Sequence, residues 1–475
     1  DHSWAAIKGR RALKIEWDGG DNASYDTDAY LKTLAATAQA GGTSVRSAGD
    51  VKAALASAET VVEATYVAPH LAQSPMEPPV ATARPRDDGG MEIWASTQNP
   101  QAVRDTVAAL LGIKPEQVIV HVTFLGGGFG RKSKADYSAE AAYLAREIGG
   151  AVKVMWTRED DVQHGYYHSI SAQHIRAGLD ASGKVTAWQH TSAFPSIVST
   201  FDGVSDAPSD FELDLGFTEN PFDIANMELM RGKAPAHVRI GWLRSVSNIY
   251  HAFAVQSFAA ELAVKAGRDQ RDFLLELIGP DRIIDLKALG TNYGNYGDPV
   301  DVFPLDTARM KAVLRDVANR AGWDSFKQGG GHGLGIAVHR SFLTYVATAV
   351  EVQVIDGAVK VKKAWVSIDA GTVVNKEHVK AQCEGGTIYG LSAALMSSIS
   401  VKDGKVVESN FHDYLVARMP DAPHTVDVHI IESTAAPAGV GEPSTPPVVP
   451  ALANAIFNAT GKRIRTLPVG DQLSA

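Results

Sequence analysis

Apolar residues recur at helical spacing in several stretches of the chain. One stretch starts with Asn99 as N-cap and Pro100 at the first helical position, and its apolar side chains run from Val103 to Leu111 before Gly112. A second has Tyr137, Ala141, Leu144 and Ile148 on one face and ends at Gly149. The pattern predicts further helices over residues 3–13, 251–265, 305–322 and 450–460.

Alternating apolar and polar residues predict strands between these helices. The clearest runs from Val118 to Phe124, and others are expected within 60–97, over 152–156, and over 346–369 around the turn Asp356-Gly357. Residues 14–17 read as a strand after the first helix, the back half of an α/β unit whose first strand is missing. Since helices and strands interleave without strict alternation, we predict an α+β or mixed α/β fold.

Composition narrows the class of protein. The 475 residues suggest about three domains, and a charge of −9, from 45 basic and 54 acidic residues, argues against a nucleic-acid binder. Residues 443–461 form an uncharged run of membrane-spanning length, but its four prolines favour a buried loop and helix. The first residues show no basic or apolar region typical of a signal peptide.

The single cysteine, Cys383, excludes an internal disulfide and an iron–sulfur cluster or zinc ribbon held by four thiolates of this chain. His164 and His168 stand four residues apart, but no carboxylate completes a zinc signature, so no side-chain metal site is predicted. There is no Gly-x-Ser-x-Gly motif. Nucleophilic hydrolase chemistry therefore has no candidate residue.

A glycine-rich segment, Gly126 to Gly130, lies between a predicted strand and a predicted helix. Backbone N–H groups in such a segment can hold an anion or an oxo group. The segment is not a dinucleotide fingerprint, because Arg131 stands where the third glycine would be. A simple tight connection explains it equally well.

Three polar residues have both a functional and a structural interpretation. Glu442, within Gly439-Val440-Gly441-Glu442-Pro443, is either a general base with a pKa raised by desolvation or a surface acid at a helix entry. Gln98, before Asn99, is either a ligand-facing amide or part of a helix cap. Arg244, in an apolar setting, is either an anchor for an anion or a member of a buried ion pair.

Taken together, these motifs resemble one family. Their order along the chain is Ser96-Thr97-Gln98-Asn99, Gly126 to Gly130, Trp242-Leu243-Arg244, Ala381-Gln382-Cys383-Glu384-Gly385 and Gly439 to Pro443. This series is similar to the molybdenum-binding subunit of the xanthine oxidase family. The Gly-Arg-Lys after Phe129 and the Pro-Ser-Thr-Pro-Pro after Glu442 resemble the isoquinoline 1-oxidoreductase β-subunit and molybdenum aldehyde dehydrogenase branch.

The resemblance implies a role for each motif residue. Glu442 would be the general base, Gln98 would bond an oxo ligand, and Arg244 would lie near the substrate or the metal. The cofactor would be molybdenum with molybdopterin cytosine dinucleotide, and the metal would take no side-chain ligand. The implied cofactor-binding residues are Gln98, Gly127, Gly128, Phe129, Gly130, Arg131, Arg244, Gln382 and Gly441.

The resemblance also implies domains and partners. We expect a partial α/β hammerhead-like domain at 1–65 and two molybdopterin-binding domains at 66–300 and 301–475. A second glycine-rich cofactor segment is absent, so we expect another chain to supply it together with the missing N-terminal part. Electrons would pass to a separate [2Fe-2S] subunit and on to a cytochrome, with a periplasmic location expected and a cytoplasmic one as the alternative.

The expected function is that of a molybdenum hydroxylase. It would oxidise an aldehyde or hydroxylate an N-heteroaromatic compound with oxygen from water. Ser133 stands where xanthine-oxidising members carry a second glutamate, so purine hydroxylation is not expected. The alternatives are a non-catalytic homologue or assembly scaffold that pairs with a catalytic chain and, less favoured, a hydrolase that uses Glu442 as its base.

Overall fold

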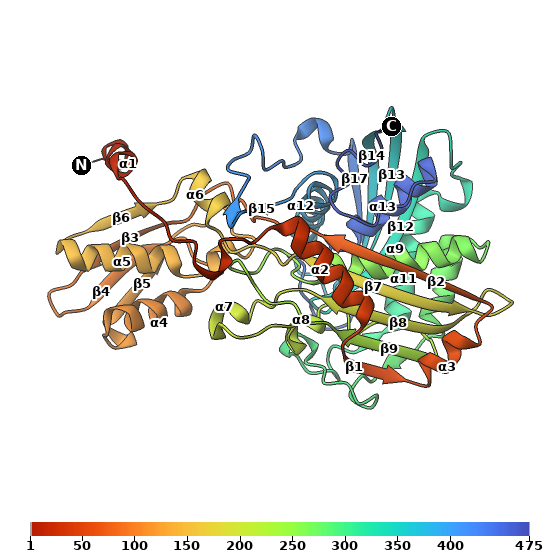
Figure 1. The fold of residues 1–475 in the computed structure, drawn as a ribbon. Helices are drawn as coiled ribbons and strands as arrows, with labels where there is room; N and C mark the ends of the chain where they lie inside the picture. The colour runs from red at the N-terminus through yellow and green to blue at the C-terminus, as the bar shows by residue number, and fades with distance from the viewer. Residues whose placement is uncertain (1, 475) are drawn as a thin grey trace.

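A five-stranded mixed sheet forms the part of the molecule drawn at lower right in Figure 1, in the computed structural model, which describes residues 2–474. Helix α2 (Thr27–Ala40) packs on one face, where Leu34 clusters with Ala172. Helix α9 (Asn248–Lys265) packs on the other face, against Ile175. Ala172 and Ile175 are three residues apart in one strand, so their side chains point to opposite faces of the sheet. The strand order is β1 (Thr43–Ala48), β9 (Asn226–Arg231), β8 (Val185–Ala193), β7 (Ser171–Leu179), β2 (Thr60–Ala68).

A second sheet of four strands shares a core with α9. Strands β13 and β14 meet at the predicted turn, where Asp356 and Gly357 both have positive φ, as a two-residue hairpin of type I′ requires. Helix α13 (Val448–Thr460) approaches β12 closely, because a Cβ on Gly335 would lie 2.2 Å from the Ala451 carbonyl oxygen. The strands are β12 (His332–Ser341), β13 (Thr344–Ile355), β14 (Ala358–Asp369) and β17 (Thr425–Ile430).

Helices on this second sheet connect it to the rest of the molecule. Helix α13 packs against both β12 and α9, so the two larger sheets share one core. Helix α11 (Thr307–Ala321) covers β13 and β14, helix α10 (Gln270–Ile278) packs against both α9 and α11, and α12 (Lys376–Leu395) packs against β17 and α13.

A smaller sheet with its own core lies at one end of the molecule, on the left in Figure 1. Its strands are β5 (Val118–Val122), β4 (Met91–Ala95), β3 (Val80–Pro85) and β6 (Val152–Met155), and its helices are α4 (Pro100–Leu111) and α5 (Asp136–Ile148).

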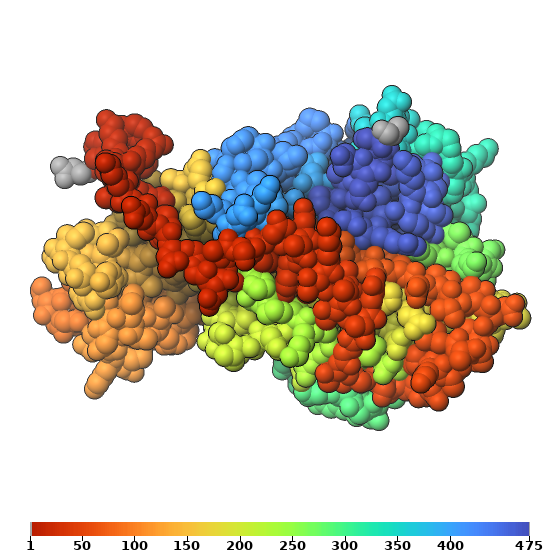
Figure 2. All heavy atoms as spheres, in the orientation of Figure 1, coloured from red at the N-terminus to blue at the C-terminus, as the bar shows by residue number. Residues whose placement is uncertain are grey.

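The remaining elements are short. We call the small sheet with α4 and α5 the small lobe and the two larger sheets with their helices the main body. The N-terminal segment runs over the surface between them, as Figure 2 shows in red, and Arg10 pairs with Asp160 of α6. These elements are α1 (Ser3–Ala12), α3 (Val51–Ala56), α6 (Arg158–Gln163), α7 (Ser199–Asp202), α8 (Asp210–Leu213), β10 (Ile283–Ile284), β11 (Leu305–Asp306), β15 (Val401–Lys402) and β16 (Lys405–Val406).

The mixed α/β class and the long helices are confirmed, but several local predictions are wrong. Residues 14–17 do not form the predicted strand, and none of the strands within residues 2–474 pairs with them. Helix α5 buries Tyr137 and Ala141 with Ala142 and Ala145, whereas Leu144 and Ile148 are exposed. The buried face therefore lies to one side of the predicted stripe, where alanines allow close contact with the sheet.

The predicted domain boundaries do not separate packing units. The boundary at residues 65 and 66 falls inside β2, and β1 and β2 belong to the same sheet as β7, β8 and β9. The boundary at residues 300 and 301 falls between β10 and β11, which pair with each other. Residues 1–65 therefore do not pack as a separate unit, because their strands complete a sheet formed mostly by later residues.

The uncharged run at 443–461 forms a loop followed by α13. Every residue of that helix from Val448 to Ile456 is buried, as the sequence predicted. In residues 2–474, no helix has the length and apolar character needed to cross a membrane.

Candidate active site

Arg244 joins three of the sequence motifs. Its backbone N–H donates to the Phe129 carbonyl at 3.0 Å, and its Nε donates to the Gly441 carbonyl at 2.8 Å. Its Nη2 donates to both the carbonyl and the side-chain Oε1 of Gln382, at 3.1 and 2.9 Å. Arg244 forms no ion pair within residues 2–474, so the ion-pair interpretation is wrong and the side chain instead holds the three motifs together.

The glycine segment before α5 needs its glycines for close contacts. A Cβ on Gly130 would lie 2.2 Å from the Trp242 carbonyl oxygen, and a Cβ on Gly128 would lie 2.3 Å from Oε1 of Gln98. Gly127 and Gly130 have positive φ, and so does Phe129 at 52°, a conformation that is uncommon outside glycine. Gln98 supports this backbone, because its Oε1 accepts a hydrogen bond from the Gly130 N–H at 3.0 Å.

Part of this backbone is free to bind a ligand. The N–H of Gly126 donates to Glu77 and that of Gly130 donates to Gln98. Within residues 2–474, the N–H groups of Gly127, Gly128 and Phe129 have no acceptor. Consecutive free N–H groups suit an anionic or oxo ligand.

Glu442 lies next to Arg244 and is largely buried. Its Oε2 accepts a hydrogen bond from the Ser245 N–H at 3.1 Å, and the Ser245 hydroxyl donates to the Glu442 carbonyl at 2.8 Å. Burial raises the pKa of Glu442 to about 6, although the Ser245 N–H and the Arg244 charge both act to lower it. The raised pKa agrees with the desolvation predicted from the sequence, and it suits a group that accepts protons near neutral pH.

The backbone that holds Glu442 is itself unusual. Ser245 and Val246 both have positive φ, at 77° and 49°, and Val246 is β-branched. Such conformations cost about 1–3 kcal/mol each and cluster at functional sites. The strain places the Ser245 N–H against the glutamate.

Arg131 is the predicted cofactor residue that the structure places elsewhere. Its side chain is fully buried, pairs with Asp136 at 2.8 Å, and lies over the ring of Trp156. The backbone of the glycine segment turns at Gly130, so the next side chain points into the small lobe rather than toward Arg244. Arg131 therefore stabilises the lobe.

The donor set in this region suits a metal that brings its own ligands. Within residues 2–474, no group of three or more His, Cys, Asp or Glu side chains is arranged to hold a metal ion. His168 donates from Nε2 to the Val246 carbonyl, and Cys383 is buried in α12. The free N–H groups near Gln98 and the amide of Gln382 fit the polar edges of an organic cofactor, so the residues present fit a pterin-bound molybdenum.

A cavity of about 510 Å³ adjoins the site. Phe129, Leu243, Gly385 and Tyr389 are among its lining residues, and a Cβ on Gly385 would lie 3.8 Å from Nη1 of Arg244. The cavity therefore reaches the side of Arg244 that faces α12.

Sequence reasoning missed Ser245, Tyr389 and Glu77. Ser245 acts through its backbone and so carries no side-chain signal. Tyr389 is seven residues after Gln382 on α12, a spacing that places both on one helix face and could have indicated it. Glu77 accepts hydrogen bonds from the Gly126 N–H and from Lys132, a contact between loops that the sequence does not reveal.

Comparisons with known proteins place this arrangement in a family. The model of the molybdopterin cofactor-binding domain matches residues 37–275, and a second model of that description matches residues 323–423. The chain is 32% identical to the membrane-bound aldehyde dehydrogenase (pyrroloquinoline-quinone) of Gluconacetobacter polyoxogenes, over 98% of this chain and 60% of that protein. It is 31% identical to the β-subunit of isoquinoline 1-oxidoreductase of Brevundimonas diminuta, over 85% of this chain and 49% of that protein.

A third relative is a subunit of the nicotinate dehydrogenase of Pseudomonas putida, which is 28% identical over 98% of this chain and 39% of that protein. The chain thus spans between 39% and 60% of the length of these three relatives.

Solved structures share the fold. Quinoline 2-oxidoreductase from Pseudomonas putida 86 superposes with a TM-score of 0.76, covering 99% of this chain and 83% of that chain at 14% identity. The aldehyde oxidoreductase from Desulfovibrio gigas gives 0.73, covering 90% of this chain and 62% of that chain at 16% identity. The two matched domains, the similar proteins and the motifs that the structure brings together show that the chain belongs to the molybdopterin-binding subunits of the xanthine oxidase family.

Proposed function

We propose that this protein is the molybdopterin-binding subunit of a molybdenum hydroxylase that oxidises an aldehyde or hydroxylates an N-heteroaromatic compound with oxygen from water. The observation that carries the proposal is Glu442, a carboxyl group whose pKa burial raises to about 6 and whose loop is held by the bond from Arg244 to the Gly441 carbonyl. Relatives named for aldehyde and isoquinoline oxidation support the substrate classes.

The residues that would hold the cofactor are those with unused donors. The N–H groups of Gly127 to Phe129 and the amide of Gln98 would contact its oxo side, and Gln382 and Gly441 would contact the pterin. When bound, molybdenum with molybdopterin would supply oxygen transfer and two-electron oxidation. We expect the cytosine dinucleotide form.

Glu442 would act as the general base. Its Oε2 is fixed by the Ser245 N–H, which leaves Oε1 to take a proton from the water-derived nucleophile. Arg244 keeps its positive charge and favours the ionised carboxylate, while its bonds to Gly441 and Gln382 fix the loop on which Glu442 stands. The charges and hydrogen bonds of both residues are thus in place before the reaction starts.

The electron acceptor would be another chain. We propose a separate [2Fe-2S] subunit, because Cys383 is the single cysteine and is buried. A further polypeptide or chain segment would supply the second glycine-rich cofactor segment, and a cytochrome would accept the electrons. Two of the relatives are named as single subunits of their enzymes, which supports an assembly of several chains. We propose a periplasmic location.

Metal analysis and isotope labelling of the purified protein test this function. We expect about one molybdenum per chain, cytosine nucleotide released on acid hydrolysis, and aldehyde-dependent reduction of an artificial acceptor. The carboxylate formed in H₂¹⁸O would carry the heavy oxygen. Purified complex without molybdenum and without acceptor reduction would contradict the proposal and favour a non-catalytic scaffold, and cleavage of an ester or amide without any acceptor would favour a hydrolase.

A further inference from the structure

Residues 341–344 form the turn between strands β12 and β13, and the sequence of this turn is unfavourable for its backbone. Ser341 pairs with Thr344, so Phe342 and Leu343 form a two-residue hairpin loop, and both have positive φ, at 47° and 69°. A loop with this conformation is usually built from asparagine, aspartate or glycine. The hairpin between β13 and β14 follows that rule. Phenylalanine and leucine make the β12–β13 turn costly, so its presence calls for an explanation.

The β12–β13 turn contacts the loop that carries Glu442. The Gly439 N–H donates to the Phe342 carbonyl at 3.1 Å, and the Thr344 hydroxyl donates to the Gly439 carbonyl at 2.6 Å. A Cβ on Gly439 would lie 3.0 Å from the Cβ of Phe342, so only a glycine approaches the turn this closely. Both polar backbone groups of Gly439 are therefore bonded to the turn.

The hydroxyl of Thr344 differs from that of a second threonine on the same strand. Thr344 and Thr348 are both completely buried, and residues four apart in a strand share one face of the sheet. The Thr344 hydroxyl donates to the Gly439 carbonyl, whereas the Thr348 hydroxyl has no hydrogen-bond partner within residues 2–474. The bond to Gly439 is the feature that distinguishes the two threonines.

The loop from Gly439 to Glu442 depends on bonds from its neighbours. Two of its four residues are glycines, which restrict the backbone little. Val440 packs against a buried apolar cluster that includes residues of α12. The far end of the loop is held by hydrogen bonds from Arg244 and Ser245. The loop is thus fixed at one end by the β12–β13 turn and at the other by the segment that contacts the carboxylate.

One further bond limits how far the loop can move. The Ala438 N–H donates to the Ala370 carbonyl, at the end of β14, at 2.9 Å. This bond remains when the Thr344 hydroxyl is removed, so the loss of that hydroxyl should shift the loop rather than detach it. A shift of about 1 Å in a catalytic group can lower a rate by a factor on the order of 10².

We propose that the β12–β13 turn positions Glu442, and that Thr344 is the residue that does so, through its hydrogen bond to Gly439. The strained turn brings the Phe342 carbonyl and the Thr344 hydroxyl to the two polar groups of one residue, three positions before the carboxylate. Thr344 is a positioning residue and takes no part in proton transfer itself. The inference rests on the proposed function, because it concerns the base of that reaction.

Turnover of Thr344→Val tests this role. The substitution removes the hydroxyl and keeps the shape of the side chain, and we expect kcat with benzaldehyde to fall about tenfold. A shifted loop would expose Glu442 to water, so the midpoint of the pH profile of kcat/KM should move from about 6 toward the ordinary pKa of 4.5. Arg244 and Tyr389, the ionisable neighbours of Glu442, keep their charge states between pH 4.5 and pH 8, so the midpoint reports on Glu442.

Two further threonine variants separate the hydrogen bond from packing. Thr348→Val is the matched control and should change neither kcat nor the midpoint, because no bond is lost. Thr344→Ser keeps the hydroxyl and should keep at least half of the wild-type kcat. Equal kcat and equal midpoints for Thr344→Val and Thr348→Val would overturn the proposal. A tenfold loss in Thr344→Ser would assign the effect to the lost methyl group and would overturn it too.

Stability measures the position of Glu442 without turnover. At pH 7.5, Glu442→Gln should raise the melting temperature, because the buried carboxylate is ionised there and destabilises the fold. In the Thr344→Val background this increase should fall by at least half, since the carboxylate would then be solvated. In the Thr348→Val background it should be unchanged. An equal increase in both backgrounds would contradict the positioning role.

These measurements distinguish failure of the inference from failure of the proposed function. If Glu442→Gln abolishes turnover but Thr344→Val behaves like Thr348→Val, the inference fails and the proposed function stands. If Glu442→Gln keeps the wild-type turnover with molybdenum bound, the assigned base is wrong. The melting temperatures of the double variants then still decide whether Thr344 positions the loop of Glu442.

Discussion

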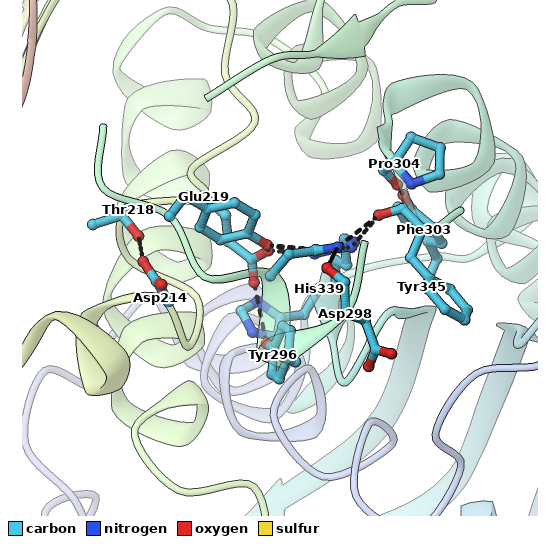
Figure 3. A network of polar contacts seen from close by, with 12 residues as sticks. Asp214, Thr218, Glu219, Tyr296, Asp298, Phe303, Pro304, His339 and Tyr345 are labelled. Carbon is cyan, nitrogen blue, oxygen red and sulfur yellow. Dashed lines mark hydrogen bonds and ion pairs between the residues drawn. The ribbon is translucent and has the colours of Figure 1, made fainter. Parts of the chain in front are cut away.

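Two arginine–glutamate regions of this molecule differ in how completely their polar groups are paired. Arg340 and Glu219 are almost fully buried and pair at 2.6 Å, and Glu219 also accepts from Tyr293 and Tyr296, as Figure 3 shows around Glu219. Glu442 accepts one backbone hydrogen bond, and Arg244 donates to carbonyl and amide oxygens rather than to a carboxylate.

The difference shows which of the two glutamates has a carboxylate oxygen that is free to bond a ligand. Arg340 further donates to Asn295 and to the Phe303 carbonyl, so this network ties the irregular segment 293–303 to strand β12. Burial raises the pKa of Glu219 too, but its oxygens are already used. A raised pKa therefore indicates a functional carboxyl only where an oxygen remains free for a ligand.

The largest effect is expected on the free energy of unfolding, when the Arg340–Glu219 pair is broken. Glu219→Ala leaves Arg340 buried without its partner and should cost about 3–5 kcal/mol. Glu63→Ala, which breaks an exposed pair with Arg176, is the control and should cost less than about 1 kcal/mol. Thermal unfolding measures both. Similar melting temperatures for the two variants would show that the Arg340 network does not support the fold.

A substitution of Glu442 at the candidate site should have a smaller effect on the free energy of unfolding, and one of opposite sign. The pKa of Glu442 is near 6 when folded and 4.5 ordinarily, so its ionisation above pH 6 costs the fold about 2 kcal/mol. Glu442→Gln should therefore raise the melting temperature at pH 7.5. The gain should shrink between pH 6 and pH 4.5 and vanish below that. A destabilised variant at pH 7.5 would contradict the assigned pKa shift.

The pH dependence of turnover follows from the same pKa. A general base must be deprotonated, so kcat/KM should be constant above about pH 6 and fall tenfold per pH unit below it. Steady-state kinetics between pH 5 and pH 8 with benzaldehyde would measure the profile. A midpoint near 4.5 would mean that burial does not perturb Glu442, and the assigned role of burial would then be wrong.

The smallest expected effect concerns the glycine segment. Gln98→Ala removes the hydrogen bond from the Gly130 N–H, which supports the backbone of the glycine segment, and should lower kcat about tenfold. The fold should be unchanged, since Gln98 is exposed and contributes little to the core. Gln101→Ala, one turn away on α4, bonds only Asp105 and serves as the control. An unchanged kcat together with an unchanged fold would remove Gln98 from the site.

Much of the fold was predictable where local signals are strong. The cap at Asn99, the turn at Asp356 and Gly357, and the helix around residues 251–265 all follow from short-range rules, and the structure confirms them. The false strand at 14–17 and the misplaced face of α5 depend on which neighbours a segment meets. Such neighbours come from distant parts of the chain and carry no local signal.

The site was predictable as a set of motifs but not as a geometry. Spacing identified Glu442, Gln98, Arg244 and Gln382, yet only the structure shows that Arg244 bonds Phe129, Gln382 and Gly441 together. Arg131 follows the glycine segment directly, but the change of backbone direction at Gly130 places its side chain with Asp136 in the core of the small sheet, which its position in the sequence does not reveal.

We propose that Glu442 is the base of a molybdenum hydroxylase, and one variant tests this role. The most direct measurement is the kcat of Glu442→Gln, with molybdenum and pterin content determined on the same sample and Glu432→Gln, an exposed glutamate, as control. We predict a loss of about 10³-fold in kcat with cofactor content unchanged, within the range usual for a general base. Turnover at the wild-type rate with full cofactor content would contradict the role of Glu442 as the base.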